Sequence, residues 1–256
     1  MRVTLLGCGS SPGVPMIGCR CDVCTSENLR NRRTRASVHV EVKGQHLLID
    51  TSPDLRQQAL ANGITRVDAL FYTHAHADHT HGIDEMRSFN YLGNKAIPCF
   101  ADTETLKELM SRFPYAFLPP VPEYGWFRPS LEPVEMFALK PVQVGPVTVL
   151  PLEQLHGRLR SYGFRIGNVA YSPDANALPE ETLQALEGID VWIVDCLRPR
   201  SSPTHASLEM AESWIARIKP KRAILTHMSH ELEYDALAAT LLDGVEPGYD
   251  GLVVEC

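Results

Sequence analysis

The chain has 256 residues, of which 44% are hydrophobic and 21% charged, so it contains enough apolar material for one large core. It has no run of about eighteen apolar residues that would span a bilayer, and its opening residues MRVTLLG lack the basic head and apolar stretch of an export signal. The formal net charge of -7 gives no general attraction to nucleic acid or anionic membranes. We therefore expect a single cytoplasmic domain, residues 1–256, that acts on a small substrate and forms no membrane contact or stable nucleic-acid complex.

The first distinctive motif is a group of three cysteines, Cys19, Cys21 and Cys24. The odd total of seven cysteines argues against a disulfide framework and for a reducing compartment. Three thiolates are one ligand short of a closed tetrahedral zinc site. We predict that the loop 19–24 binds a structural zinc ion, with His230 as the natural fourth ligand; free thiols are the alternative.

The next segment, residues 30–35, contains four arginines that form either a solvated turn or a site for a substrate phosphate. Residues 37–42 then alternate in hydrophobicity and predict a hairpin with the apolar run 47–49. Its two histidines, His39 and His46, are expected to be surface or core-edge side chains. Residues 54–63 predict a helix with Asp54 as its N-cap, and residues 69–72 predict a buried strand.

The rest of the chain alternates between strand-like and helix-like segments. Strands are predicted at 147–150, 163–166, 191–194 and 223–225, and helices at 183–186 and 206–218. Hairpins combined with this alternation indicate two mixed sheets flanked by helices, and not a doubly wound parallel sheet. Residues 113–133 are rich in proline and aromatic residues and predict an ordered insertion or lid.

The strongest chemical signal is the segment THAHADHTHG directly after the strand 69–72. It contains His74, His76, Asp78 and His79. Borderline divalent metals prefer imidazole and carboxylate ligands, and this spacing can direct two residues toward one ion and two toward another. We interpret the segment as part of a metal centre.

With LIDTSPD before it, this motif resembles the metallo-β-lactamase superfamily over nearly the whole chain. The resemblance implies an α/β fold of four αββα layers, with two mixed β-sheets packed face to face and helices outside. It also implies two catalytic ions: one held by His74, His76 and His156, the other by Asp78, His79 and His227, with Asp174 as the bridge. Asp50 resembles the family's carboxylate that orients metal ligands, although an aspartate in a strand-end turn is the alternative.

The cysteine group, together with T-H-x-x-H near the C-terminus, more closely resembles the PhnP family of phosphodiesterases, which is related to tRNase Z. This implies attack on a small, cyclic or nucleotide-like phosphodiester by a hydroxide that bridges two divalent ions, zinc or manganese. His205 matches a histidine near the leaving group and would be the general acid, with Asp78 assisting; a simple helix N-cap region is the alternative. The resemblance also suggests a homodimer.

Three other functions stay open. A thioesterase of the glyoxalase II kind shares H-x-H-x-D-H, but does not call for the cysteine group or for His205. A tRNase Z-like nuclease shares His205, yet the sequence shows no long basic arm to hold tRNA. A non-catalytic zinc-binding or nucleotide-binding module would not need the complete ligand set.

Overall fold

The computed structural model describes residues 1–121, 123 and 125–256, whose strands form two seven-stranded mixed β-sheets. The first sheet has the spatial order β14 (Leu252–Glu255), β1 (Arg2–Gly7), β2 (Ser37–Val42), β3 (Gln45–Ile49), β4 (Ala69–Phe71), β5 (Ile97–Ala101) and β6 (Leu131–Glu135). The second has the order β13 (Val245–Pro247), β12 (Arg222–Thr226), β11 (Val191–Asp195), β10 (Val169–Ser172), β9 (Leu159–Ile166), β8 (Val147–His156) and β7 (Val142–Val144).

Each sheet combines an antiparallel part with a parallel part. In the first sheet, β14, β1, β2 and β3 pair antiparallel, and β3, β4, β5 and β6 pair parallel. In the second sheet, β13 to β10 pair parallel, and β10 to β7 pair antiparallel. The parallel strands of each sheet therefore end at a common edge, where the loops that follow them can meet.

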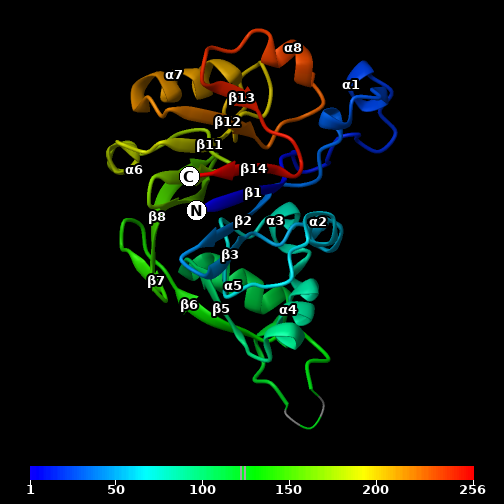
Figure 1. The fold of residues 1–256 in the computed structure, drawn as a ribbon, viewed down its shortest axis with the longest axis vertical. Coiled ribbons are helices and arrows are strands. Elements are labelled where there is room, and N and C mark those ends of the chain that lie inside the picture. Colours follow the sequence, from blue (N-terminus) through cyan, green and yellow to red (C-terminus); the bar gives the residue numbers. More distant parts are fainter. Residues whose placement is uncertain (122, 124) are drawn as a thin grey trace.

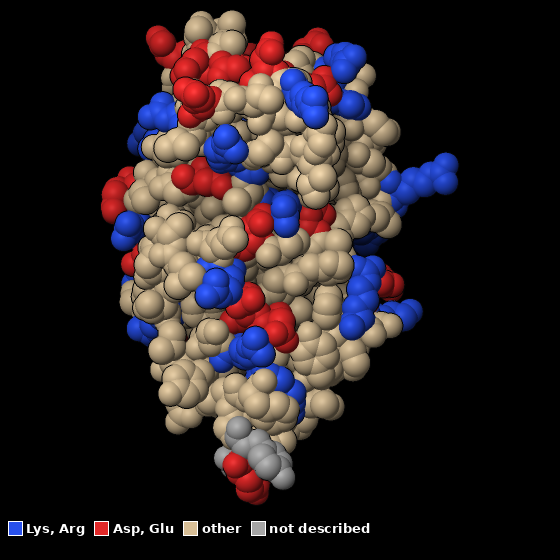
Figure 2. Space-filling model, turned by 90° about the vertical axis from the view of Figure 1, so that its right-hand side faces the viewer, with Lys and Arg blue, Asp and Glu red and all other residues tan. Residues whose placement is uncertain are grey.

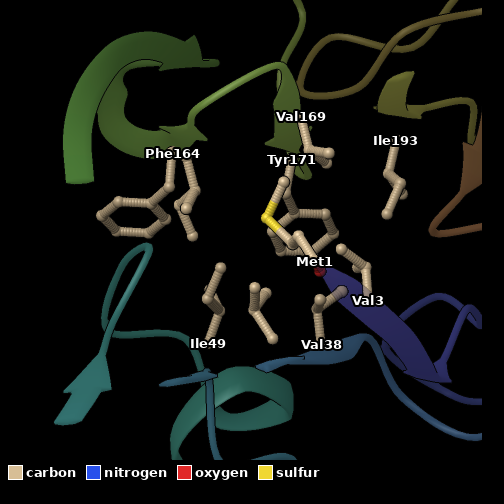
Figure 3. A pocket seen from close by; sticks show the side chains of 10 residues that line it. Met1, Val3, Val38, Ile49, Phe164, Val169, Tyr171 and Ile193 are labelled. Atoms are coloured by element: carbon tan, nitrogen blue, oxygen red, sulfur yellow. The ribbon is translucent and has the colours of Figure 1, made fainter. Parts of the chain in front are cut away.

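The two sheets pack face to face through apolar side chains (Figure 3). Val3, Val38 and Ile49 of the first sheet meet Phe164, Tyr171 and Ile193 of the second. The cavity left between them measures about 10 Å³, which is at most room for one water molecule. This close packing fixes the relative position of the two sheets.

Helices cover the outer faces, which completes the four predicted αββα layers (Figure 1). The alternation along β3 shows why both faces are covered: Leu47 and Ile49 belong to the core between the sheets, whereas Leu48 packs in the core under the helices. The helices are α1 (Asp22–Thr25), α2 (Leu55–Asn62), α3 (Ala77–Thr80), α4 (Met86–Gly93), α5 (Thr103–Arg112), α6 (Glu180–Leu186), α7 (Leu208–Ile218) and α8 (Tyr234–Ala238), with 3-10 turns η1 (Leu29–Asn31), η2 (Ile83–Glu85) and η3 (Pro114–Phe117).

The predicted helix at 54–63 corresponds to α2, which ends at Gly63 in the left-handed conformation. Asp54 occupies the N-cap position but makes no capping bond; its carboxylate accepts the backbone N–H of Arg35 and pairs with the Arg35 guanidinium. In the predicted insertion 113–133, residues 122 and 124 lie outside the described part of the chain, and β6 already begins at Leu131. Among the described residues, no helix is long and apolar enough to cross a membrane.

Candidate metal centre

The first sheet contributes four polar side chains from the segment that follows β4. His74 and His76 lie in the extended stretch before α3, and Asp78 and His79 lie within this four-residue helix. Asp50 follows β3 and is fully buried; one of its oxygens accepts the backbone N–H of Thr73 at 2.8 Å, and the other lies 2.6 Å from Nδ1 of His79. Asp50 therefore holds the His79 ring with Nε2 directed away from it, as a carboxylate does for a metal-binding histidine.

The second sheet contributes its residues from the ends of three strands. His156 ends β8, Asp174 follows β10, and His227 follows β12. Asp174 has a φ of 47° and His227 a φ of 58°, a left-handed backbone that is uncommon for residues other than glycine. Asp50 shares this conformation with a φ of 63°. Such backbone strain at three chemically active positions is typical of a functional site.

These residues form two adjoining groups of possible ligands. His74, His76 and His156 offer atoms within 4.8 Å of one another, and so do Asp78, His79, Asp174 and His227. Asp174 faces both groups: its Oδ1 is 3.1 Å from Nε2 of His79, and its Oδ2 is 3.8 Å from Nε2 of His74. The structure thus places this carboxylate where a bridge between two ions is expected.

The donor atoms at the centre of this cluster are suited to metal ions. Within the described residues, Nε2 of His74 is buried and has no hydrogen-bond partner, and the buried atoms Nε2 of His79 and Oδ1 of Asp174 lie 3.1 Å apart without good hydrogen-bond geometry. By contrast, Nδ1 of His74 contacts the Thr73 hydroxyl, and Nδ1 of His156 contacts the Thr204 carbonyl. Buried polar atoms without a partner are costly, and a divalent ion would satisfy them.

The two groups differ in how they bind protons. Burial alone would lower the pKa of His79, but Asp174, Asp50 and Asp78 hold it well above its usual value. The pKa of His227 is also raised, because Asp174 and Asp78 outweigh its burial. For His74 burial prevails, and its pKa lies well below the usual value. The carboxylate-rich group therefore binds protons in the absence of metal.

Metal binding to the metal-free protein at neutral pH should release protons. A histidine binds a metal ion only as a neutral imidazole, whereas His79 and His227 stay protonated at any pH below their raised pKa values. Lowering the pH should weaken binding at this group, and raising the pH should strengthen it. Calorimetric titration with Zn²⁺ in two buffers of different ionisation enthalpy measures the release. Heats that do not depend on the buffer would contradict the expectation.

His205 lies at the edge of the cluster, next to a residue that the sequence motifs did not predict. Its Nδ1 is 3.1 Å from Oδ2 of Asp195, a fully buried carboxylate at the end of β11. The same oxygen accepts the backbone N–H of Ala175, which follows Asp174, at 2.9 Å. His156, Asp174 and His205 also form a third group of possible metal ligands. Asp195 thus fixes the His205 ring relative to the proposed bridging carboxylate.

The structure brings part of the predicted zinc loop together. Cys19, Cys21 and His230 offer atoms within 4.8 Å of one another, and Cys24 is tied to Cys21 because its backbone N–H donates to the Cys21 sulfur at 3.5 Å. Burial and these neighbours raise the pKa of Cys24 to about 11. Cys21 is the N-cap of α1, so this short helix holds Cys21 close to Cys24.

The arginine segment 30–35 contains both buried and exposed side chains: Arg33 is buried, whereas Arg30 and Arg32 are exposed. Arg33 is 1% exposed, and its guanidinium donates to the carbonyls of Ser229 and Leu232. Arg30 stacks over Tyr234 and Tyr249. These contacts of Arg33 and Arg30 hold the loop between His227 and α8.

If the cysteine group binds zinc as predicted, replacing Cys21 by serine should release that ion and lower both melting temperature and turnover. His230 is three residues from His227, and an error of about 1 Å in a catalytic group costs on the order of a hundredfold in rate. Elemental analysis, thermal melting and kinetics of Cys21→Ser measure the three effects. Cys256→Ser, which changes an exposed thiol, is the matched control. Loss of the ion with unchanged melting and turnover would show that the group is dispensable.

The comparisons with known proteins agree with this architecture. Residues 45–228 match the model of a family described as the β-lactamase superfamily domain. Because the match covers most of the chain, the protein belongs to the β-lactamase superfamily, in which the metal-dependent hydrolases share this sandwich. Within this superfamily the chain is PhnP-like. It is 34% identical to a protein whose crystal structure is described as a new diphosphatase from the PhnP family, with a TM-score of 0.92. The match covers 100% of this chain and 97% of the diphosphatase chain.

Other relatives are longer or more distant. An octanoyltransferase from Porphyromonas gingivalis is 36% identical over 98% of this chain but only 51% of its own length, so the chain spans about half of that curated relative. A coenzyme PQQ synthesis protein B from Methylobacterium radiotolerans is 38% identical over 34% of each chain. The short form of human tRNase Z shares the fold, with a TM-score of 0.71, 17% identity, and coverage of 100% of this chain and 99% of its own.

Proposed function

We propose that this hydrolase cleaves a small phosphodiester, with two divalent ions, zinc or manganese, bound at the cluster. The observation that carries the proposal is the position of Asp174, whose two oxygens face two separate groups of histidines. His74, His76 and His156 would hold one ion, and Asp78, His79 and His227 the other. Bound there, two ions would supply a water of lowered pKa and neutralise charge on phosphoryl oxygens.

The protein's own residues would then act on orientation and proton transfer. Asp195 accepts a hydrogen bond from Nδ1 of His205 and leaves Nε2 of this ring to deliver a proton to the departing alkoxide. Asp195 would orient the ring for this transfer. Asp78 lies 3.4 Å from His79 and 3.5 Å from His227, among the proposed ligands of the second ion. Its proposed assistance in proton transfer would therefore be additional to its role as a ligand.

A hollow of about 530 Å³ opens beside His74 and His76, and its size suits a nucleotide-like molecule. Arg158 and Arg160 line one part of it, and Glu104 and Glu108 line another. Arginine binds phosphate oxygens, and carboxylates accept hydrogen bonds from sugar hydroxyls. This combination supports a substrate that carries both a phosphate and hydroxyl groups.

The charge on one face of the molecule supports a small substrate over a long polyanion. On the face drawn in Figure 2, which bears α1 and α4, lysine and arginine are interspersed with aspartate and glutamate. A nuclease that grips RNA needs a continuous basic surface. We therefore keep the tRNase Z-like activity as the less favoured alternative.

The decisive experiment is a substrate screen with purified protein of known metal content. The substrates are a 2′,3′-cyclic nucleotide, bis(p-nitrophenyl) phosphate, a nucleoside diphosphate ester, and an octanoyl thioester. We expect metal-dependent cleavage of one or more of the phosphorus substrates and its loss on chelation. Turnover of the thioester alone would select a thioesterase, or acyl transfer of the kind named for the Porphyromonas relative. No turnover by fully metal-loaded protein would leave a binding module and overturn the proposal.

A further inference from the structure

A further set of imidazole and carboxylate side chains lies on the outer face of the first sheet, away from the cluster and the cysteine group described above. His39 and Glu41 are on β2, and His46 is on the neighbouring strand β3. In the antiparallel register Glu41 is directly opposite His46, and His39 is opposite Leu48, which packs under the outer helices. All three side chains therefore share the outer face, because side chains alternate along a strand.

The three side chains converge. They offer ligand atoms within 4.8 Å of one another, the two imidazole rings have centroids 5.3 Å apart, and Nδ1 of His39 is 3.9 Å from the Glu41 carboxylate. β3 leads from this place to Asp50, so the set lies at the opposite end of that strand from the proposed catalytic ions.

His39 is unusual for a buried polar side chain. It is 1% exposed, and within the described part of the chain neither ring nitrogen has a partner with good hydrogen-bond geometry. The polar groups beside its ring are the Glu41 carboxylate, 3.9 Å away, and the backbone of Arg66, which makes only a weak hydrogen-bonding contact with the ring. Arg2 lies 3.7 Å from Glu41 but leaves the imidazole unsatisfied. A buried imidazole without a partner is costly unless something absent from the protein chain binds it.

Solvent reaches this place. A hollow of about 310 Å³ is lined by Arg2, Glu41 and His46, among others, and a hydrated ion can enter it. Glu41 and His46 are partly exposed there, whereas His39 forms the buried end of the set.

We propose that His39, Glu41 and His46 bind a divalent transition-metal ion at a site independent of both the catalytic cluster and the cysteine group. Two imidazoles and one carboxylate suit Zn²⁺, Ni²⁺ or Cu²⁺. With three protein ligands, water fills the remaining positions, so the ion exchanges more readily than one in a closed thiolate site. Because its ligands come from both strands of the β2–β3 hairpin, the ion would hold these two strands together.

The test compares metal uptake by the fully loaded protein and by a variant that lacks one imidazole. Wild type and His46→Gln, both with measured catalytic and cysteine-site metal, are dialysed against a series of free Zn²⁺ concentrations. We expect the wild type to bind one ion more per chain than the variant. Gln45→Ala is the matched control, since Gln45 is the adjacent residue and its side chain lies against Gly145 on the other face; this variant should keep the additional ion.

A local measurement separates this site from the others. Added Zn²⁺ should slow amide hydrogen exchange at residues 42–45 in the wild type and leave it unchanged in His46→Gln. Glu41→Gln serves as a second variant if His46→Gln melts early, and it should likewise lose the ion. Equal zinc uptake by wild type and both variants, or unchanged exchange in the wild-type hairpin, would overturn the proposal.

Discussion

Asp174→Ala should abolish turnover and lower the occupancy of both catalytic metal positions. Its two carboxylate oxygens face different histidine groups, so removing them takes a ligand from each ion at once. We expect a larger effect than the roughly 10-fold to 100-fold loss that follows removal of a residue that only orients a metal ligand. Metal analysis and kinetics of the variant measure both effects.

Asp78→Ala is the comparison that makes this result informative. Asp78 contacts only residues of the second group among the proposed ligands, His79 and His227, so its loss should deplete mainly one ion. Asp243→Ala, which changes an exposed carboxylate, should keep full occupancy and activity. If Asp174→Ala and Asp78→Ala each lose both ions completely, the bridging assignment is wrong.

His205→Ala should keep its metals and fold but turn over slowly any substrate with a poor leaving group. Loss of a general acid costs roughly a hundredfold to ten-thousandfold when protonation of the alkoxide limits the rate. A nitrophenolate departs with little help, so the deficit on a nitrophenyl ester should be much smaller. Parallel kinetics on an alkyl and a nitrophenyl phosphodiester give this ratio.

Asp195→Asn provides the companion measurement. Asparagine keeps the size of the side chain but cannot balance an imidazolium, so this variant should show the same dependence on the leaving group as His205→Ala. Equal losses on both esters, or loss of metal from His205→Ala, would show that His205 is a metal ligand or a structural residue.

The elements that the sequence predicted correctly are those with a strong local pattern. The hairpin of β2 and β3 has strict alternation, and α2 ends at a glycine that adopts the left-handed conformation. The partnership of β1 with β14 was not predictable in this way, because Arg2 pairs with Glu255 across nearly the whole chain. Neither short strand contains a signal that specifies a partner so distant.

The candidate site was predictable where ligand types cluster in sequence, as they do from His74 to His79. Asp195 was missed, although it ends the apolar strand β11 much as Asp50 ends the apolar run of β3. An aspartate directly after a buried strand was therefore the available signal. Arg33 had no such signal: its complete burial depends on carbonyls of a loop nearly two hundred residues later, which only the tertiary structure brings near.

The division of ligands between the two sheets has a thermodynamic consequence. His74 and His79 come from the first sheet, and His156 and His227 from the second, so each proposed ion would cross-link the two halves of the sandwich. Binding only to the folded state adds about 4 kcal/mol per site when the free ion is a thousandfold above its dissociation constant. Resistance to heat, denaturant and proteolysis should therefore rise and fall with metal supply. In a cell short of metal, this protein would lose abundance as well as activity.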